Sequence, residues 1–307
     1  MLAVSITQPA SPNGNPVVET RTLDAEPGMV IKLWDKPIQQ QEDGKDEGET
    51  ISCYVEINLI DWASILEIDG FISDRKEHVE RDLTVANHQI LFIGDSITCG
   101  LALEASDGGQ PAPQGILDAF PCRAISILRE KHSYPLSLDV VAYPGIPLVG
   151  LDNDSGSPLV TGMVDRFFYV SFISGTPWTP QGTPQFICIA LGMNDEANDV
   201  PPQIFRSTLE RFIRTLSATF PSVKAFYVIP PFRDFNEPDA GAIHADLISN
   251  PLAVDAHDVR VCGDIASGMT AEHTADGLHP TCSGHNHLAG NLARYLKAQR
   301  PPPDSEG

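Results

Sequence analysis

The sequence predicts an α/β protein in which a three-layer α/β/α domain, built on a parallel sheet, follows a small antiparallel β-sandwich. From residue 89 onward, short apolar runs of strand length alternate with longer segments whose apolar residues recur at helical spacing. Before residue 89, short β-like runs are separated by polar loops. We therefore expect a jelly-roll-like sandwich over 1–88, an α/β domain over 89–300 and a disordered tail over 301–307.

The individual elements follow from these patterns. In the N-terminal part, strand-like runs cover 17–23, 30–33, 51–59 and 65–68, and an acidic loop covers 39–49. In the larger part, we expect strands over 90–93, 136–143, 186–192 and 224–230, and helices over 117–132, 204–220 and 285–299. Asp118 is placed to act as the N-cap of the first of these helices.

Composition and charge exclude some classes of partner. The 307 residues carry a formal net charge of −21, which repels phosphate backbones and anionic lipids. We therefore expect neither nucleic acid nor membrane as a partner, whereas the oligomeric state stays open. The first residues lack a signal-peptide pattern, and the six cysteines are too scattered for a disulfide framework or a metal knuckle. These features favour a cytoplasmic protein with free thiols.

The residues just after the strands carry the chemistry, because ligands of a parallel sheet bind at the carboxyl ends of its strands. Ser96 follows the first strand, and Asp276 and His279 precede the last helix. A serine hydroxyl becomes a nucleophile when a histidine takes its proton, and a carboxylate orients that histidine. Thr98 stands where the elbow of α/β-hydrolases has its second glycine, which favours another strand-to-helix arrangement.

Acyl transfer also needs hydrogen-bond donors aimed at the developing oxyanion. Ser96 offers its own backbone N–H, and Gly145, without a Cβ, lets a second backbone N–H approach closely. Asn194 adds a side-chain amide donor. The neighbouring Asp95 and Asp195 are expected to bond loop backbone rather than to do chemistry.

Four short blocks carry a resemblance to a known superfamily. "GDSIT" with Ser96, "YPG" with Gly145, "GMND" with Asn194 and "DGLHP" with Asp276 and His279 occur in the order of the SGNH (GDSL-type) hydrolases. The resemblance covers residues 89–299. It implies that Ser96 is the nucleophile, that His279 is the base and that Asp276 orients it. It also implies an oxyanion hole of Ser96, Gly145 and Asn194, and no cofactor.

Within that superfamily, the chain is most similar to carbohydrate esterase family 2. There, too, a β-sandwich precedes the hydrolase domain, and the nucleophile block reads very like "FIGDSITCG". The segment "TPWTPQGTPQFICIALGMND" also resembles that family. This resemblance implies a serine esterase that removes short acyl groups, acetyl above all, from carbohydrate. Trp178 is a candidate for stacking on a sugar, with packing as the equal alternative.

Other interpretations remain open at this point. A lipid esterase or thioesterase for longer acyl chains, an acyltransferase, and a carbohydrate-binding protein without turnover share the same features. His285 and His287 invite a metal site, but two residues apart on a helix they face different ways, so we predict no metal. Cys99 and Cys282 each follow a site residue by three positions, so at least one is a candidate to line or back the site, although burial as small hydrophobic side chains is the favoured interpretation.

Overall fold

The computed structural model describes ten stretches of the chain: residues 2–8, 17–23, 54–59, 88–101, 115–134, 136–152, 158–180, 182–232, 241–254 and 258–299. The chain divides into two compact units, Met1–Leu83 and Thr84–Gly307.

The described part of the N-terminal unit is a three-stranded antiparallel sheet. Its strands are β1 (Leu2–Gln8), β2 (Val17–Leu23) and β3 (Tyr54–Leu59), in the order β2-β1-β3. Val4 and Ile6 are buried and, two positions apart, point to the same face of β1. The sequence predicted β2 and, within the run 51–59, all of β3, but it did not predict β1. The runs 30–33 and 65–68, the acidic loop and the tail lie outside the described residues, so the complete sandwich stays a prediction.

The larger unit is built on a five-stranded parallel sheet, which confirms the predicted α/β class. Its strands lie in the order β10-β9-β8-β4-β5. They are β4 (His88–Gly94), β5 (Leu136–Ala142), β8 (Phe186–Ala190), β9 (Ala225–Ile229) and β10 (Asp258–Val261). β10 is an edge strand that the sequence did not reveal. Because β4 begins at His88, the predicted domain boundary after residue 88 falls just inside this strand, and both domain limits stay predictions.

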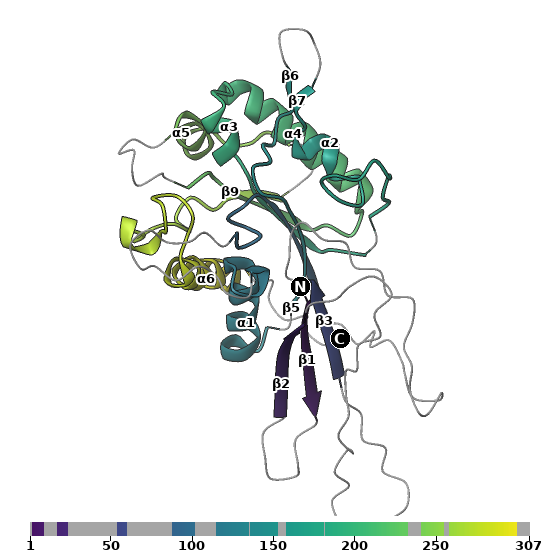
Figure 1. The fold of residues 1–307 in the computed structure, drawn as a ribbon. Coiled ribbons are helices and arrows are strands. Elements are labelled where there is room, and N and C mark those ends of the chain that lie inside the picture. Colours follow the sequence, from purple (N-terminus) through teal and green to yellow (C-terminus); the bar gives the residue numbers. More distant parts are fainter. Residues whose placement is uncertain are drawn as a thin grey trace, which may run out of the picture. The chain divides into compact units, whose positions relative to one another are not determined.

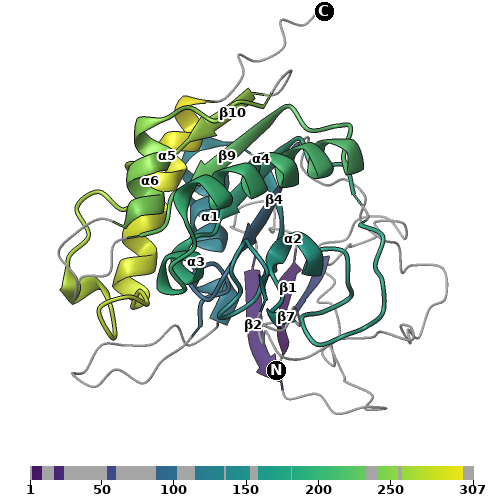
Figure 2. The same ribbon diagram turned by 90° about the horizontal axis from the view of Figure 1, so that it is seen from above.

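Helices cover both faces of this sheet, as Figure 1 shows and as Figure 2 shows from above. Packed on one face are α1 (Phe120–His132) and α6 (Cys282–Ala298); on the other are α2 (Met163–Arg166), α4 (Pro202–Thr219) and α5 (Ala242–Ser249). The remaining elements are α3 (Met193–Ala197), the short strands β6 (Leu151–Asp152) and β7 (Pro158–Val160), and the 3-10 turns Gly115–Leu117 and Ala271–His273. None of the described helices combines the length and hydropathy needed to cross a bilayer.

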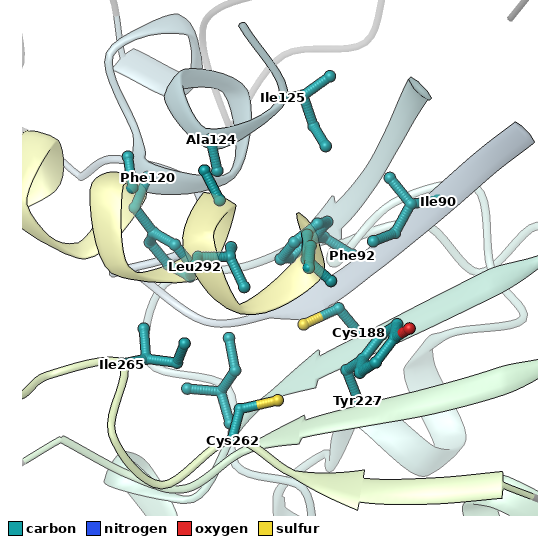
Figure 3. Close-up of a cluster of buried hydrophobic side chains, with 14 of the residues drawn as sticks. Ile90, Phe92, Phe120, Ala124, Ile125, Cys188, Tyr227, Cys262, Ile265 and Leu292 are labelled. Carbon is teal, nitrogen blue, oxygen red and sulfur yellow. The ribbon is translucent and has the colours of Figure 1, made fainter. Parts of the chain in front are cut away.

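The two apolar layers explain why the central strands are apolar at every position. In β4, Ile90 and Phe92 face the α1 and α6 side, whereas Leu91 and Ile93 face the α4 side. All four are buried, as a strand covered on both faces requires. Figure 3 shows the first layer, where Phe92 packs with residues of α1 and α6.

The start of α1 differs from the prediction. The N-cap residue of α1 is Ala119 rather than Asp118, and the side chain of Ala119 makes no capping hydrogen bond. Instead, the N–H of Phe120 donates to Nδ1 of His285 on α6, at 3.2 Å. The cap therefore comes from a side chain 165 positions away, which a local pattern does not reveal.

Candidate active site

The nucleophile candidate lies where the connections of the sheet reverse direction. β4 pairs with β5 on one side and with β8 on the other, so the chain leaves β4 in one direction and later returns to pair on its opposite edge. Ligands of such sheets bind at the carboxyl ends of the strands beside this switch point. Ser96 stands directly after β4, and the loops with Gly145 and Asn194 follow β5 and β8.

The turn that presents Ser96 is held by its own neighbours. Oδ1 of Asp95 accepts the N–H of Ile97 at 3.0 Å, and the carbonyl oxygen of Ser96 accepts the N–H of Leu101 at 3.0 Å. A Cβ at Gly94 would overlap the side chain of Thr98, so these two positions are matched in size. The threonine thus fills the space over Gly94, in a turn that differs from the elbow with two glycines. Ser96 is 7% exposed.

Ser96, His279 and Asp276 form one chain of hydrogen bonds. Nε2 of His279 lies 3.0 Å from Oγ of Ser96, across 183 positions of sequence. On the other side of the ring, Nδ1 of His279 lies 2.8 Å from Oδ2 of Asp276. Because the carboxylate accepts at Nδ1, the ring carries its proton there and leaves Nε2 free to accept from the serine hydroxyl.

The surroundings of Asp276 favour its ionised form. Its partial burial acts to raise its pKa, but hydrogen bonds from the side chain and N–H of His279 and from the N–H of Leu278 outweigh this effect, so the pKa lies below its ordinary value. The two N–H groups reach Oδ1 at 2.7 and 3.0 Å. The side chain is 43% exposed, whereas that of His279 is 17% exposed.

The loop that carries this pair closes on itself before α6. The N–H of Ala275 donates to the carbonyl of His279 at 2.8 Å, and the N–H of Thr281 donates to the carbonyl of His273 at 2.9 Å. The hydroxyl of Thr281 then caps α6 by accepting the N–H of Gly284 at 3.2 Å. His279 is therefore held two residues before the N-cap of α6, which limits its movement relative to Ser96.

Two of the predicted oxyanion donors, Gly145 and Asn194, lie on a loop and on the short helix α3, which contact each other. Gly145 is exposed, has φ +74° and has open space where a Cβ would stand. Asn194, the second residue of α3, donates one amide hydrogen to the carbonyl of Ile146 at 3.0 Å, which leaves its second amide hydrogen. Within the described part of the chain, the N–H groups of Ser96 and Gly145 donate to no other group. They are available as donors.

Two further carboxyl groups lie beside these residues, and both bond loop backbone, as predicted. Asp195 accepts the N–H groups of Leu148 at 2.8 Å and Val149 at 2.9 Å. Burial raises the pKa of Asp195 to about 6, against the lowering effect of these two N–H groups. Burial, assisted by the nearby charge of Asp195, raises the pKa of Asp95 to about 7, although the N–H of Ile97 acts to lower it.

The structure places the other candidates in packing or backbone contacts. The indole of Trp178 lies against Phe167, with ring centroids 6.1 Å apart, so the structure supplies a packing role, and sugar stacking stays a prediction. Nε2 of His287 donates to the carbonyl of Ser267 at 2.7 Å. Burial lowers the pKa of His285 to about 4, so this ring is neutral. Across the described stretches, no three His, Cys, Asp or Glu side chains are grouped to hold a metal ion.

One of the two cysteines near the site backs the nucleophile turn. The Sγ of Cys99 donates to the carbonyl of Ser96 at 3.4 Å. Burial, assisted by the charge of Asp95, raises the pKa of the Cys99 thiol to about 12, so it is protonated. Cys99, Cys122, Cys188, Cys262 and Cys282 are free thiols, and Cys53 lies outside the described residues.

Solved structures that match this chain include family two carbohydrate esterases. An enzyme from Myceliophthora fergusii with a carbohydrate-binding domain matches at 15% identity over 97% of this chain and 88% of its own, with a TM-score of 0.58. An esterase from Cellvibrio japonicus matches at 20% identity over 70% of this chain and 62% of its own, with a TM-score of 0.54.

An active-site mutant of a family two esterase from Clostridium thermocellum matches at 19% identity over 70% of this chain, with a TM-score of 0.53. The alignments thus span 64% and 62% of the Clostridium and Cellvibrio chains. Neither a protein-family model nor a curated protein matched the sequence. At these identities, the comparisons establish that the chain has the fold of the family two carbohydrate esterases.

Proposed function

We propose that this protein is a serine esterase that hydrolyses short acyl esters, and that its preferred substrates are acetyl esters of carbohydrates. The observation that carries this proposal is the unbroken chain from Ser96 Oγ through both ring nitrogens of His279 to Asp276. Nucleophilic acyl transfer requires a chain of this order next to available hydrogen-bond donors, and among the described residues the N–H groups of Ser96 and Gly145 donate to no other group. The Ser-His-Asp mechanism below follows from it.

In the first step, Oγ of Ser96 attacks the ester carbonyl carbon while Nε2 of His279 takes the hydroxyl proton. The carbonyl π electrons move to oxygen, and this oxyanion is held by the N–H groups of Ser96 and Gly145 and by the amide of Asn194. One donor of this kind is worth about 10²- to 10³-fold in kcat. Asp276 stabilises the imidazolium that forms at His279.

In the second step, the bond between the carbonyl carbon and the sugar oxygen breaks, and the imidazolium gives its proton to that oxygen. The acyl group stays on Ser96. His279, neutral again, then takes a proton from water as the water oxygen attacks the acyl carbon. The bond to Oγ breaks, the proton returns to Ser96, and the carboxylic acid leaves.

The choice of a carbohydrate ester is supported by the fold and by charge. The esterase folds matched here belong to carbohydrate esterases, and one of them, from Clostridium thermocellum, was solved in complex with cellohexaose. The net charge of −21 favours neutral or cationic substrates over anionic ones. Acetylated neutral sugars satisfy both conditions.

Ser96→Ala tests the proposal. The variant should lose acetate release from acetylated sugars by about 10³-fold or more, because no other group supplies the nucleophile. Ser126→Ala is the matched control, because Ser126 lies exposed on α1 and its hydroxyl donates within its own helix. Both variants are compared with the wild type by circular dichroism. Full acetate release by folded Ser96→Ala would exclude the assignment.

The same enzyme preparation separates the alternatives. A series of nitrophenyl esters should show a preference for acetyl, and a preference for long chains would replace the proposal with a lipid esterase or thioesterase. A fluorophosphonate probe should label wild-type Ser96. An unlabelled protein that binds sugars would be a carbohydrate-binding protein without turnover. Acyl transfer to a sugar in place of water would make it an acyltransferase.

A further inference from the structure

The loop that offers the Gly145 N–H is bound to α3 through two consecutive side chains. We call residues 143–149 the Gly145 loop. Asn194 donates to the carbonyl of Ile146 at 3.0 Å. Asp195, its neighbour, accepts from the N–H of Leu148 at its Oδ2 and from the N–H of Val149 at its Oδ1, at 2.8 and 2.9 Å. Both oxygens of one carboxyl group thus hold two successive peptide groups of the loop.

Asp195 lies in an unusual environment for a carboxyl group. Its exposed fraction is 0%, so it does not contact a substrate or bulk water. Burial of such a group is unfavourable unless hydrogen bonds compensate, and here the compensation comes from the Gly145 loop itself. Conversely, without Asp195, the Leu148 N–H would be buried with no acceptor.

The other anchors of the loop attach it to different elements. The N–H of Tyr143 donates to the carbonyl of Gly94 at 3.2 Å, and the N–H of Met163 donates to the carbonyl of Pro147 at 2.8 Å. Neither bond involves α3. The hydrogen bonds of Asn194 and Asp195 therefore set the distance between the Gly145 loop and α3. Two bonds to one planar group restrain both translation and rotation, which a single bond does not.

We propose that Asp195 is a positioning residue for the oxyanion site: by holding Leu148 and Val149, it sets the Gly145 N–H relative to the amide of Asn194. This inference rests on the esterase proposed above. Asp195 acts through the loop and takes no part in bond making. The donors that it aligns are those that bind the transition state more strongly than the ground state.

Asp195→Asn is the first test. An amide keeps the shape of the carboxyl group but has one acceptor oxygen, so its NH₂ group faces one of the two loop N–H groups. The loop must shift, and a misplacement of about 1 Å costs on the order of 10²-fold in rate. We expect kcat for nitrophenyl acetate to fall about 10- to 100-fold with KM nearly unchanged, because ground-state binding does not use the oxyanion donors.

Two further readouts separate positioning from general damage. A short alkylboronic acid forms a tetrahedral adduct on Ser96, and its affinity should fall by a factor similar to the fall in kcat. Hydrogen exchange at the Leu148 and Val149 amides should become faster, because these amides lose their acceptor. This exchange measurement does not depend on turnover. It therefore tests the link between Asp195 and the Gly145 loop even if the wild type releases no acetate. Absence of acetate release by the wild type would exclude the proposed esterase but not this link.

Glu196→Gln is the matched control. Glu196 is the next residue of α3, and its Oε1 accepts a backbone N–H, that of His244 on α5, at 3.0 Å. That bond lies away from the Gly145 loop, and glutamine keeps an acceptor oxygen for it. The control should keep wild-type kcat, boronate affinity and amide exchange in the loop.

Wild-type kcat in folded Asp195→Asn would overturn the proposal, as would a rise in KM at unchanged kcat. If Asp195→Asn does not fold, Asp195→Glu decides, because it keeps two acceptor oxygens but displaces them by one methylene. A folded Asp195→Glu with reduced kcat and unchanged KM supports the proposal, and one with wild-type kcat overturns it. If neither variant folds, Asp195 has a purely structural role and the proposal falls.

Discussion

Asp276 and Asp195 both accept two backbone N–H groups beside the same candidate site, yet their acidities move in opposite directions. Asp276 is 43% exposed, and its pKa lies below the ordinary value. Asp195 is fully buried, and its pKa is raised to about 6. The number of backbone hydrogen bonds is therefore not what separates them. The difference comes from the surroundings, namely loss of water at Asp195 and the added His279 side chain at Asp276.

This comparison suggests a division of labour. A carboxyl group that must stabilise an imidazolium has to be ionised, so it remains near water and beside the ring. A carboxyl group that fixes a loop needs only two acceptor oxygens in a rigid place, and burial supplies the rigidity. Substitutions at Asp276 and Asp195 should therefore affect activity and stability differently.

The largest effect is expected for the activity of Asp276→Asn. The amide presents an NH₂ group or a weaker acceptor to Nδ1 of His279, which favours the wrong tautomer of the ring. We expect a fall in kcat of up to about 10⁴-fold, measured as acetate release. Asp264→Asn, in the same C-terminal region, is a control. An Asp276→Asn enzyme with wild-type kcat would show that backbone contacts alone orient His279.

A smaller effect concerns the pH dependence of stability. A carboxyl group whose pKa is raised on folding stabilises the protein below its unfolded pKa, and this contribution is lost as pH rises through the folded pKa. For Asp195, the loss lies between about pH 4 and pH 6, and a raised pKa of this size corresponds to on the order of 3 kcal/mol. Asp95 adds a loss of the same sign up to about pH 7.

Urea unfolding at a series of pH values from 4 to 8 measures this effect. The free energy of unfolding of the wild type should decline over this interval. Asp195→Asn should be less stable at pH 4 but decline less steeply, because the titrating group is gone. Equal slopes for the two proteins would contradict the coupling between burial and ionisation at Asp195.

The smallest effect is expected for the stability of Asp276→Asn. The lowered pKa of Asp276 stabilises the fold above pH 3.8, and this contribution is lost as pH falls through the folded pKa. Because the side chain is well exposed, solvent screens the interaction, and the substitution should change the free energy of unfolding at pH 7 by less than about 1 kcal/mol. A loss as large as that in Asp195→Asn would erase the distinction between the two carboxylates.

Most of the α/β unit was predictable from periodicity. The predicted helix over 204–220 is α4 at Pro202–Thr219, and the predicted helix over 285–299 is α6 at Cys282–Ala298. β10 escaped because an edge strand of four residues, with Asp258 and Arg260 alternating with valines, lacks the apolar run of a central strand. α5 escaped because its eight residues include little polar contrast between faces.

For some residues of the candidate site the sequence predicted both the residue and its partner, and for others only the residue. Ser96, Gly145 and Asn194 were predicted from their chemistry and their places after strands, and Asp276 and His279 from their chemistry and their place before the last helix. The structure links Ser96, His279 and Asp276 by hydrogen bonds. Asp195 was expected to bond loop backbone. The two N–H groups that donate to its carboxyl oxygens belong to residues 47 and 46 positions away in the sequence. Nothing in the local sequence names Leu148 and Val149 as those partners.

The amino-acid sequence alone was sufficient to predict the alternation of strands and helices and the set of side chains able to do acyl chemistry. Both depend on residue type and on spacing along one element, which are local properties. The long-range contacts of the tertiary structure determine that His285 accepts the first N–H of α1, that the pKa of Asp276 is lowered beside His279 and that Asp195 is buried beneath the Gly145 loop. Burial and long-range partners set these outcomes, because acidity and capping depend on which distant groups exclude water.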